Sequence, residues 1–161
     1  QGDRVIVDMM EQLGVACEPR AKQILLRKKD HLPSFSWDFT DCPDLAQTIA
    51  VVCAAKGIEG SFKGLESLRI KETDRIAALQ KELQKINAQL VEEGDAWRLI
   101  PSKQLPMEVI IHTYHDHRMA MAFAPLAALM HVAIEDPAVT RKSYPRFWDD
   151  MRNLGFQLLS Q

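Results

Sequence analysis

Three segments of the chain repeat one pattern of apolar and polar residues, and their starts lie about 70 residues apart. They begin at Asp3, Asp74 and Tyr144. Apolar residues recur in each at intervals of three or four, the spacing that places side chains on one helix face. The pattern therefore predicts three amphipathic helices with these buried residues: Val5, Ile6, Met9, Met10 and Leu13; Ile76, Leu79, Leu83 and Ile86; Phe147, Trp148, Met151 and Leu154.

Each predicted helix is followed by a residue that ends helices. Gly14, Asn87 and Gly155 come just after the last apolar position of their segments. Glycine and asparagine adopt the left-handed conformation of a helix end more readily than other residues do. Pro145 suits the first turn of the third helix, because proline has no N–H and the first turn needs none.

A second type of segment also repeats. Residues 43–57 and 115–130 each place an aspartate, Asp44 or Asp116, before a run of small apolar residues, which predicts helices buried on all sides. Alternating residues at 89–92 and 96–100 predict two strands joined by a turn with the sequence EEGD. The predicted unit is strand, buried helix, strand, amphipathic helix, strand, strand, which indicates an α/β (α+β) class with buried helices under sheets.

Composition agrees with one folded domain and limits the possible functions. Hydrophobic residues make up 47% of the 161 residues, enough to fill a core, and the longest apolar run, 119–130, is shorter than the roughly 20 residues of a membrane span. A net charge of -2 with scattered Lys and Arg argues against nucleic-acid binding. Three cysteines without a C-x-x-C pair favour a reducing cytoplasm. The start at Gln1 suggests a fragment.

The repeat places several charged residues at one end of their units. Lys71 and Lys142 occupy corresponding positions, as do the helix starts at Asp44 and Asp116. Helix starts favour anions, and Arg75, His117 and Arg118 lie beside them in the sequence. We therefore expect a local cationic site for a small, multiply anionic ligand.

Simpler interpretations of these residues remain open. Asp44 and Asp116 are ideal helix N-caps, and the sequence KETDR at 71–75 is also typical of a solvated helix start. His112, His115 and His117 could ligate a metal in a hydrolase, although no further ligand lies at a familiar spacing. Glycine-rich nucleotide loops and the G-x-S-x-G motif of serine hydrolases do not occur.

Four stretches resemble one family. LRIKETDR at 68–75, YHDHRMAMAFA at 114–124, PDLAQTIA at 43–50 and RKSYPRFW at 141–148 are similar to the C-terminal half of the 5-enolpyruvylshikimate-3-phosphate synthases. The resemblance implies a monomeric two-domain enzyme with three βαβαββ units per domain and an active site between the domains. Residues 1–161 would form most of the C-terminal domain, about two and a half units, without the N-terminal domain.

The resemblance also implies the chemistry. Members of the family transfer the enolpyruvyl group of phosphoenolpyruvate to the 5-hydroxyl of shikimate 3-phosphate, on the pathway to chorismate and the aromatic amino acids, with release of phosphate and without a metal or cofactor. Their partners are these two substrates and the other domain, with no nucleic acid or membrane. We expect the isolated fragment to be inactive, because half of the substrate contacts are absent.

Site residues are carried over by position. Asp44 resembles the residue that takes the 5-hydroxyl proton, Lys71 a catalytic lysine at shikimate 3-phosphate, and Glu72 the acid that exchanges protons with the methylene carbon of phosphoenolpyruvate. The residues matching those that bind phosphoenolpyruvate are Arg75, His117, Arg118 and Lys142.

Two departures and two alternatives accompany the resemblance. Ser67 stands where several members have an asparagine that contacts shikimate 3-phosphate, and His115 where asparagine or glycine is common. The alternatives are an enolpyruvyl transferase acting on UDP-N-acetylglucosamine, which shares the fold but lacks these motifs, and a module on the same fold that binds RNA or phosphate.

Overall fold

One complete repeat unit occupies residues 34–100 of the computed structural model, which describes residues 2–71 and 73–159. Its elements follow the predicted order and confirm the α/β class. They are β3 (Ser34–Asp38), α2 (Ala46–Lys56), β4 (Glu59–Lys63), α3 (Arg75–Lys85), β5 (Gln89–Glu93) and β6 (Ala96–Ile100). Short 3-10 helices, η2 (Pro43–Leu45) and η3 (Glu66–Ile70), precede α2 and α3.

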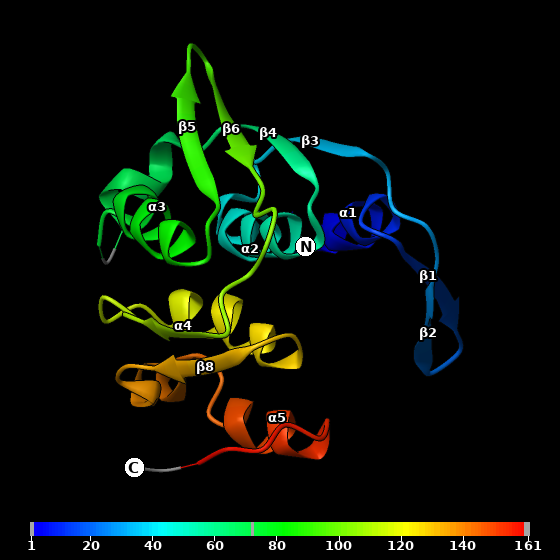
Figure 1. Ribbon diagram of the computed structural model, residues 1–161. Helices are drawn as coiled ribbons and strands as arrows, with labels where there is room; N and C mark the ends of the chain where they lie inside the picture. Colours follow the sequence, from blue (N-terminus) through cyan, green and yellow to red (C-terminus); the bar gives the residue numbers. More distant parts are fainter. Residues whose placement is uncertain (1, 72, 160–161) are drawn as a thin grey trace.

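The strands of this unit form a four-stranded sheet in the order β3-β4-β6-β5. β3 and β4 are parallel, because α2 connects them, whereas β6 is antiparallel to both β4 and β5. The predicted hairpin is confirmed, and Gly94 in its turn has a φ of 65°. Figure 1 shows α2 and α3 together on one side of this sheet.

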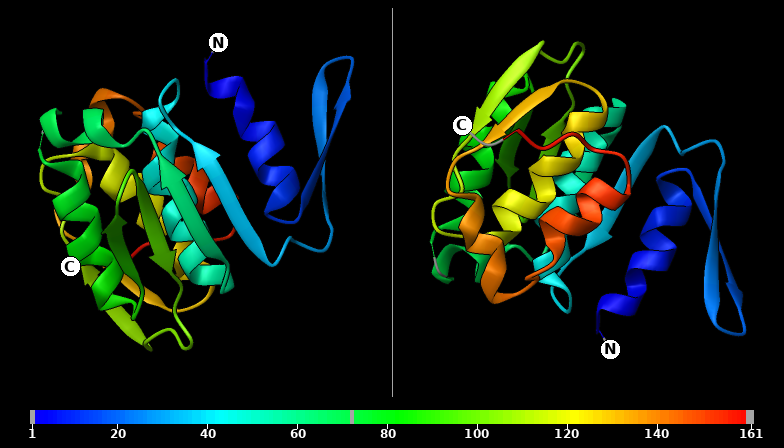
Figure 2. Two further views of the ribbon diagram at one scale, coloured as in Figure 1. Left: turned by 90° about the horizontal axis from the view of Figure 1, so that it is seen from above. Right: turned by 90° about the horizontal axis from the view of Figure 1, so that it is seen from below.

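Parts of the same unit lie before and after the complete one. The earlier part is η1 (Gly2–Val5), α1 (Ile6–Gln12) and the antiparallel hairpin of β1 (Val15–Arg20) and β2 (Gln23–Lys28), which projects from the rest of the molecule (Figure 2). The later part is β7 (Glu108–Ile111), α4 (His117–Phe123), η4 (Ala124–Ala128), β8 (His131–Ile134), η5 (Pro137–Lys142) and α5 (Phe147–Asn153). β7 and β8 are parallel, as β3 and β4 are.

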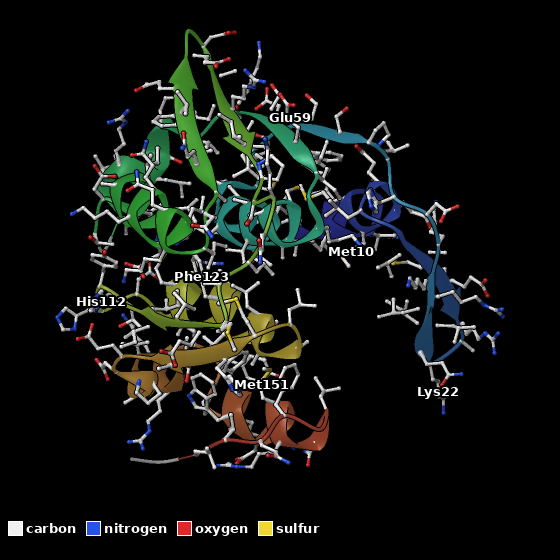
Figure 3. All side chains as sticks on the ribbon, in the orientation of Figure 1. Met10, Lys22, Glu59, His112, Phe123 and Met151 are labelled. Atoms are coloured by element: carbon white, nitrogen blue, oxygen red, sulfur yellow. The ribbon has the colours of Figure 1, made fainter. Side chains whose placement is uncertain are left out.

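A common core joins the three parts. Met9 of α1, Leu79 of α3 and Met119 of α4 are fully or almost fully buried in the same cluster. Phe123, near the middle of Figure 3, also belongs to this cluster. α5 packs mainly through a smaller cluster around Phe147. The residues predicted to be buried in the second amphipathic helix are all buried, although Ile86 lies just beyond the end of α3.

The predictions for helix ends are partly confirmed. Gly14, Asn87 and Gly155 all have positive φ, between 61° and 96°, as expected of residues that end helices. Pro145 is outside the third helix, because α5 begins only at Phe147. The helix then ends at Asn153, so the side chain of Leu154 lies beyond its last turn and is 76% exposed, contrary to the prediction.

The second predicted buried helix is shorter than expected. α4 ends at Phe123, and the chain continues as the 3-10 helix η4 with Pro125 in its first turn. Proline cannot donate to the carbonyl four residues earlier, and its ring crowds that carbonyl, so the α-helix cannot continue unchanged. Leu129 beyond it is exposed, so this segment is not buried on all sides. In the described part of the chain, no helix has the length and apolarity needed to cross a membrane.

Gly64, in the turn after β4, lies against Thr40 in the loop between β3 and α2. A substitution at Gly64 therefore tests how closely these two loops pack. Gly64 has a φ of 71°, and a Cβ atom there would lie 2.3 Å from the backbone nitrogen of Thr40. We expect Gly64→Ala to lower the free energy of unfolding by clearly more than about 1 kcal/mol, measured by urea denaturation. The control is Gly94→Ala, since Gly94 has a similar φ of 65° but no atom within 4 Å of the added carbon. Equal losses in the two variants would contradict this account of the loop.

The cysteines differ in environment, which predicts their reactivity. All three carry thiols, but Cys53 is fully buried in α2, and burial raises its pKa to about 12. Thiolates are the reactive form, so at pH 8 an alkylating reagent should modify the partly exposed Cys17 far faster than Cys53. Mass spectrometry of the peptides after brief labelling checks this order, and prior unfolding in urea should abolish the difference.

Candidate functional site

Arg75, the first residue of α3, is an arginine held inside the molecule. Its position follows from Asp74, the predicted start of this segment, which caps the helix by accepting a hydrogen bond from the backbone N–H of Ala77 at 3.0 Å. The Arg75 side chain is only 2% exposed. It donates from Nε to Asp116 at 2.5 Å and from Nη1 to Asp44 at 2.9 Å. Arg75 therefore joins carboxylates from two different repeat units.

Arg118, near the start of α4, approaches the same carboxylate of Asp44 from the other unit. Its Nη2 donates to Asp44 Oδ2 at 2.7 Å, and its Nη1 donates to the Asp44 backbone carbonyl at 3.3 Å. Each oxygen of the Asp44 carboxylate thus accepts from a different arginine. Among the described residues, the buried Nε of Arg118 has no hydrogen-bond acceptor. An oxyanion bound there could supply one, and a buried donor without a partner is costly.

Asp116 is the central residue of the cluster. It accepts from the backbone N–H of Arg118 at 2.8 Å, so the predicted N-cap of the second buried helix is confirmed. Its side chain is fully buried, and its pairing with Arg75 supplies the partner that a buried carboxylate needs. His117 Nδ1 lies 3.8 Å from Asp116 Oδ1 and is mostly buried. The site prediction did not include Asp116, although its position in the repeat, corresponding to Asp44, was a signal for it.

Asp44 does not act as the N-cap that the sequence suggested. It lies within the short helix η2, which precedes α2, and makes no side-chain capping bond in either helix. Its carboxylate instead bridges Arg75 and Arg118, and the Asp44 side chain is 33% exposed. The two bridging arginines attract the carboxylate more strongly than neutral backbone donors do, because both partners are charged.

Two arginines and two aspartates leave this cluster close to neutral. The expected surplus of positive charge therefore depends on other groups or on moving Asp44 away from the arginines. Lys71 follows η3, and Lys142 ends η5, which packs against α4. Both lysines are exposed, and no hydrogen bond or ion pair joins either of them to the cluster within the described part of the chain.

The remaining predicted site residues are placed as follows. Ser67 is exposed on η3, which packs against both η2 and α3. Glu72 lies outside the described residues, so its predicted role stays a prediction from the resemblance. The structure therefore brings together Asp44, Arg75, His117 and Arg118, with Ser67, Lys71 and Lys142 on neighbouring elements.

The histidines do not converge on one point. His112 Nδ1 lies 2.5 Å from Glu135, at the outer edge of the molecule (Figure 3), and the side chain of His115 is 94% exposed. His117 lies beside Asp116 instead. No group of three or more His, Cys, Asp and Glu among residues 2–71 and 73–159 could hold a metal ion.

The cluster is mostly buried, and only Asp44 and Arg118 keep a partly exposed side chain, at 33% and 28%. Two shallow hollows occur in the described structure, one beside Ser61 and Arg98 and one beside Met107 and Leu129, and no residue of the cluster lines either of them.

Comparison with known proteins gives one consistent result. The sequence profile of EPSP synthase (3-phosphoshikimate 1-carboxyvinyltransferase) matches residues 1–151. A 3-phosphoshikimate 1-carboxyvinyltransferase of Bacteroides fragilis is 43% identical over 161 residues, and the match covers 97% of the chain and 39% of that relative. One of Neisseria meningitidis is 38% identical over 157 residues, covering 96% of the chain and 36% of the relative.

A solved structure agrees with the sequence comparisons. The EPSP synthase of Acinetobacter baumannii superimposes with a TM-score of 0.73 at 20% sequence identity, over 97% of this chain and 40% of that one. This likeness shows the fold. The chain spans about two fifths of the length of the proteins it matches.

Proposed function

Since the chain belongs to the EPSP synthase family, we propose that it forms part of an enzyme that transfers the enolpyruvyl group of phosphoenolpyruvate to shikimate 3-phosphate. The acceptor is the 5-hydroxyl of shikimate 3-phosphate, and inorganic phosphate is released. Residues 1–161 would be most of the C-terminal domain, and an N-terminal domain would supply the opposite side of the site. The cluster of Asp44, Arg75 and Arg118, in which Asp44 and Arg118 are partly exposed, would form one side of such a site.

The observation that carries the proposal is the meeting of two arginines from different repeat units on the carboxylate of one partly exposed aspartate. Arg75 and Arg118 each donate to a separate oxygen of Asp44. The planar guanidinium groups can make the same pair of bonds to the carboxylate or phosphate of phosphoenolpyruvate. Asp44 therefore occupies the arginines as a bound anion would, and Arg118 Nε is a further donor for that anion.

Binding would then change the role of Asp44. When phosphoenolpyruvate takes over the arginines, the Asp44 carboxylate is free to turn toward the shikimate hydroxyls. A carboxylate within hydrogen-bond reach of the 5-hydroxyl can accept its proton as that oxygen attacks the enolpyruvyl carbon. Proton transfer and anion binding are thereby coupled through one side chain.

The other residues take the roles implied by their positions. Lys71 and Ser67 would bind shikimate 3-phosphate, with Lys71 also at the reacting oxygens, while Lys142 and His117 would hold the departing phosphate. Glu72 would exchange protons with the methylene carbon of phosphoenolpyruvate. The scheme uses no metal or cofactor; the arginines and lysines of this chain, together with cationic side chains of the N-terminal domain, would bind the anionic groups of both substrates.

The cellular setting follows from the same proposal. The joined enzyme would be a monomer of the shikimate pathway in the cytoplasm, where cysteine thiols stay reduced. The thiols of Cys17, Cys42 and Cys53 support that compartment.

A chimeric enzyme tests the choice of acceptor. In it, this chain replaces the matching region of the 43% identical Bacteroides fragilis relative. We expect phosphate release from phosphoenolpyruvate with shikimate 3-phosphate and none with UDP-N-acetylglucosamine. Turnover with the nucleotide sugar alone, or salt-dependent RNA binding without turnover, would favour one of the other functions considered.

A further inference from the structure

Glu82, in the last turns of α3, is a fully buried carboxylate to which the site described above assigns no role. Its Oε1 accepts from the hydroxyl of Tyr114 at 2.8 Å. Its Oε2 accepts from the backbone N–H of His112 at 3.1 Å and from Lys85 Nζ at 2.7 Å. Apart from Lys85, the partners belong to the short segment between β7 and α4, so Glu82 fastens that segment to α3.

The segment has an unusual backbone. Tyr114 and His115 have φ values of 54° and 59°, so two successive residues other than glycine adopt the left-handed conformation. Side chains disfavour this conformation, and it persists where surrounding contacts hold it. The Tyr114 hydroxyl on Glu82 is one such contact, and the bond from the backbone N–H of Asp116 to the Thr113 carbonyl at 2.9 Å is another.

This turn determines where Asp116 lies. Asp116 follows His115 directly and accepts from Arg75 Nε at 2.5 Å. Arg75 and Glu82 are seven residues apart on α3, so they lie on the same face about two turns apart. One face of α3 therefore contacts the 112–116 segment twice. Arg75, at the start of the helix, bonds to Asp116, and Glu82, near its end, bonds to Tyr114.

The Tyr114 hydroxyl is a stable donor for this contact. Burial, with a further contribution from the hydrogen bond to Glu82, raises the Tyr114 pKa to about 12. The hydroxyl consequently keeps its proton throughout the pH range in which the protein would work. Of the groups facing Glu82, Lys85 also donates to the Ile110 carbonyl at 2.9 Å, which fixes its ammonium beside β7.

We propose that Glu82 and Tyr114 are positioning residues, which hold Asp116 against Arg75 and thereby set the geometry of the anion-binding arginine. The ligand part of this inference rests on the proposed function, whereas the positioning of Arg75 does not. A purely structural role would predict lower stability in variants with an unchanged Arg75 environment. A positioning role predicts that the Arg75 contact itself changes.

The test uses Tyr114→Phe, which removes only the hydroxyl, and Glu82→Gln, which keeps the size of the side chain. The control is Glu135→Gln, which alters an exposed carboxylate bonded to His112 in the same region. The first readout is the Arg75 Nε–H resonance in ¹H–¹⁵N spectra of the chain, which reports the short bond to Asp116. The second is the dissociation constant of phosphoenolpyruvate in the chimeric enzyme, by titration calorimetry.

We expect Tyr114→Phe and Glu82→Gln to shift the Arg75 Nε–H resonance and to weaken phosphoenolpyruvate binding by about tenfold, with both readouts unchanged in Glu135→Gln. If Glu82→Gln fails to fold, Tyr114→Phe carries the test. An Arg75 resonance in Tyr114→Phe identical to that of the unaltered chain would overturn the inference. Absence of phosphoenolpyruvate binding by the unaltered chimera would instead contradict the proposed function, and the resonance would still decide the positioning role.

Discussion

Arg75→Ala is expected to lower the free energy of unfolding of the chain by about 3 to 5 kcal/mol, because it leaves the buried carboxylate of Asp116 without its charged partner. Asp44 loses one partner as well but stays bonded to Arg118. In the chimeric enzyme, the same variant should lose roughly 2 to 4 kcal/mol of transition-state stabilisation, since the guanidinium would no longer bind phosphoenolpyruvate. Urea denaturation and initial rates of phosphate release measure the two effects.

A matched arginine separates this effect from the general loss of a charge. Arg152 on α5 donates to Asp149 at 2.8 Å, but both side chains are exposed. Exposed ion pairs contribute roughly 0 to 1 kcal/mol, so Arg152→Ala should change stability within that range and leave the rate unaltered. Similar losses of stability for Arg75→Ala and Arg152→Ala would show that the Arg75 cluster is not the buried network described here.

Asp44→Asn is expected to lower kcat of the chimeric enzyme by about 10² to 10⁴, the usual range for removal of a general base. The asparagine side chain can still accept a hydrogen bond from one arginine, and the site is 33% exposed, so the stability loss should be smaller than for Arg75→Ala. Rates at saturating concentrations of both substrates isolate the effect on kcat.

The control for this variant is Asp149→Asn, which neutralises an exposed carboxylate on α5 that pairs with Arg152. It should leave kcat unchanged. If Asp44→Asn retained kcat within about threefold of the unaltered chimera, proton transfer to Asp44 would be excluded, since a general base contributes far more.

Local patterns predicted those features that depend on residues near one another in the sequence. The apolar spacing of α3, its cap at Asp74 and its end at Asn87 are all present. The hairpin around Gly94 and the order of elements in the central unit follow in the same way. The apolar run continues past Pro125, so apolar spacing alone predicts a longer helix than α4, which ends at Phe123.

The contacts of the site depend on distant residues, and the sequence pattern could not supply them. Asp44 had the sequence context of a helix cap, but Arg75 and Arg118 lie 31 and 74 positions away and reach it only in the folded chain. Asp116 fulfils both roles, as a cap and as the partner of Arg75. Charged partners that are distant in the sequence thus decide the role of each aspartate, and local propensity cannot reveal them.

The central claim is that this chain supplies one side of an enolpyruvyl transfer site and needs an N-terminal domain to act. The most direct measurement is phosphate release from phosphoenolpyruvate and shikimate 3-phosphate by three samples: the isolated chain, the N-terminal part of the Bacteroides fragilis relative, and the two joined as the chimera. We predict turnover by the chimera alone. Turnover by the isolated chain, or an inactive chimera that is correctly folded, would contradict the claim.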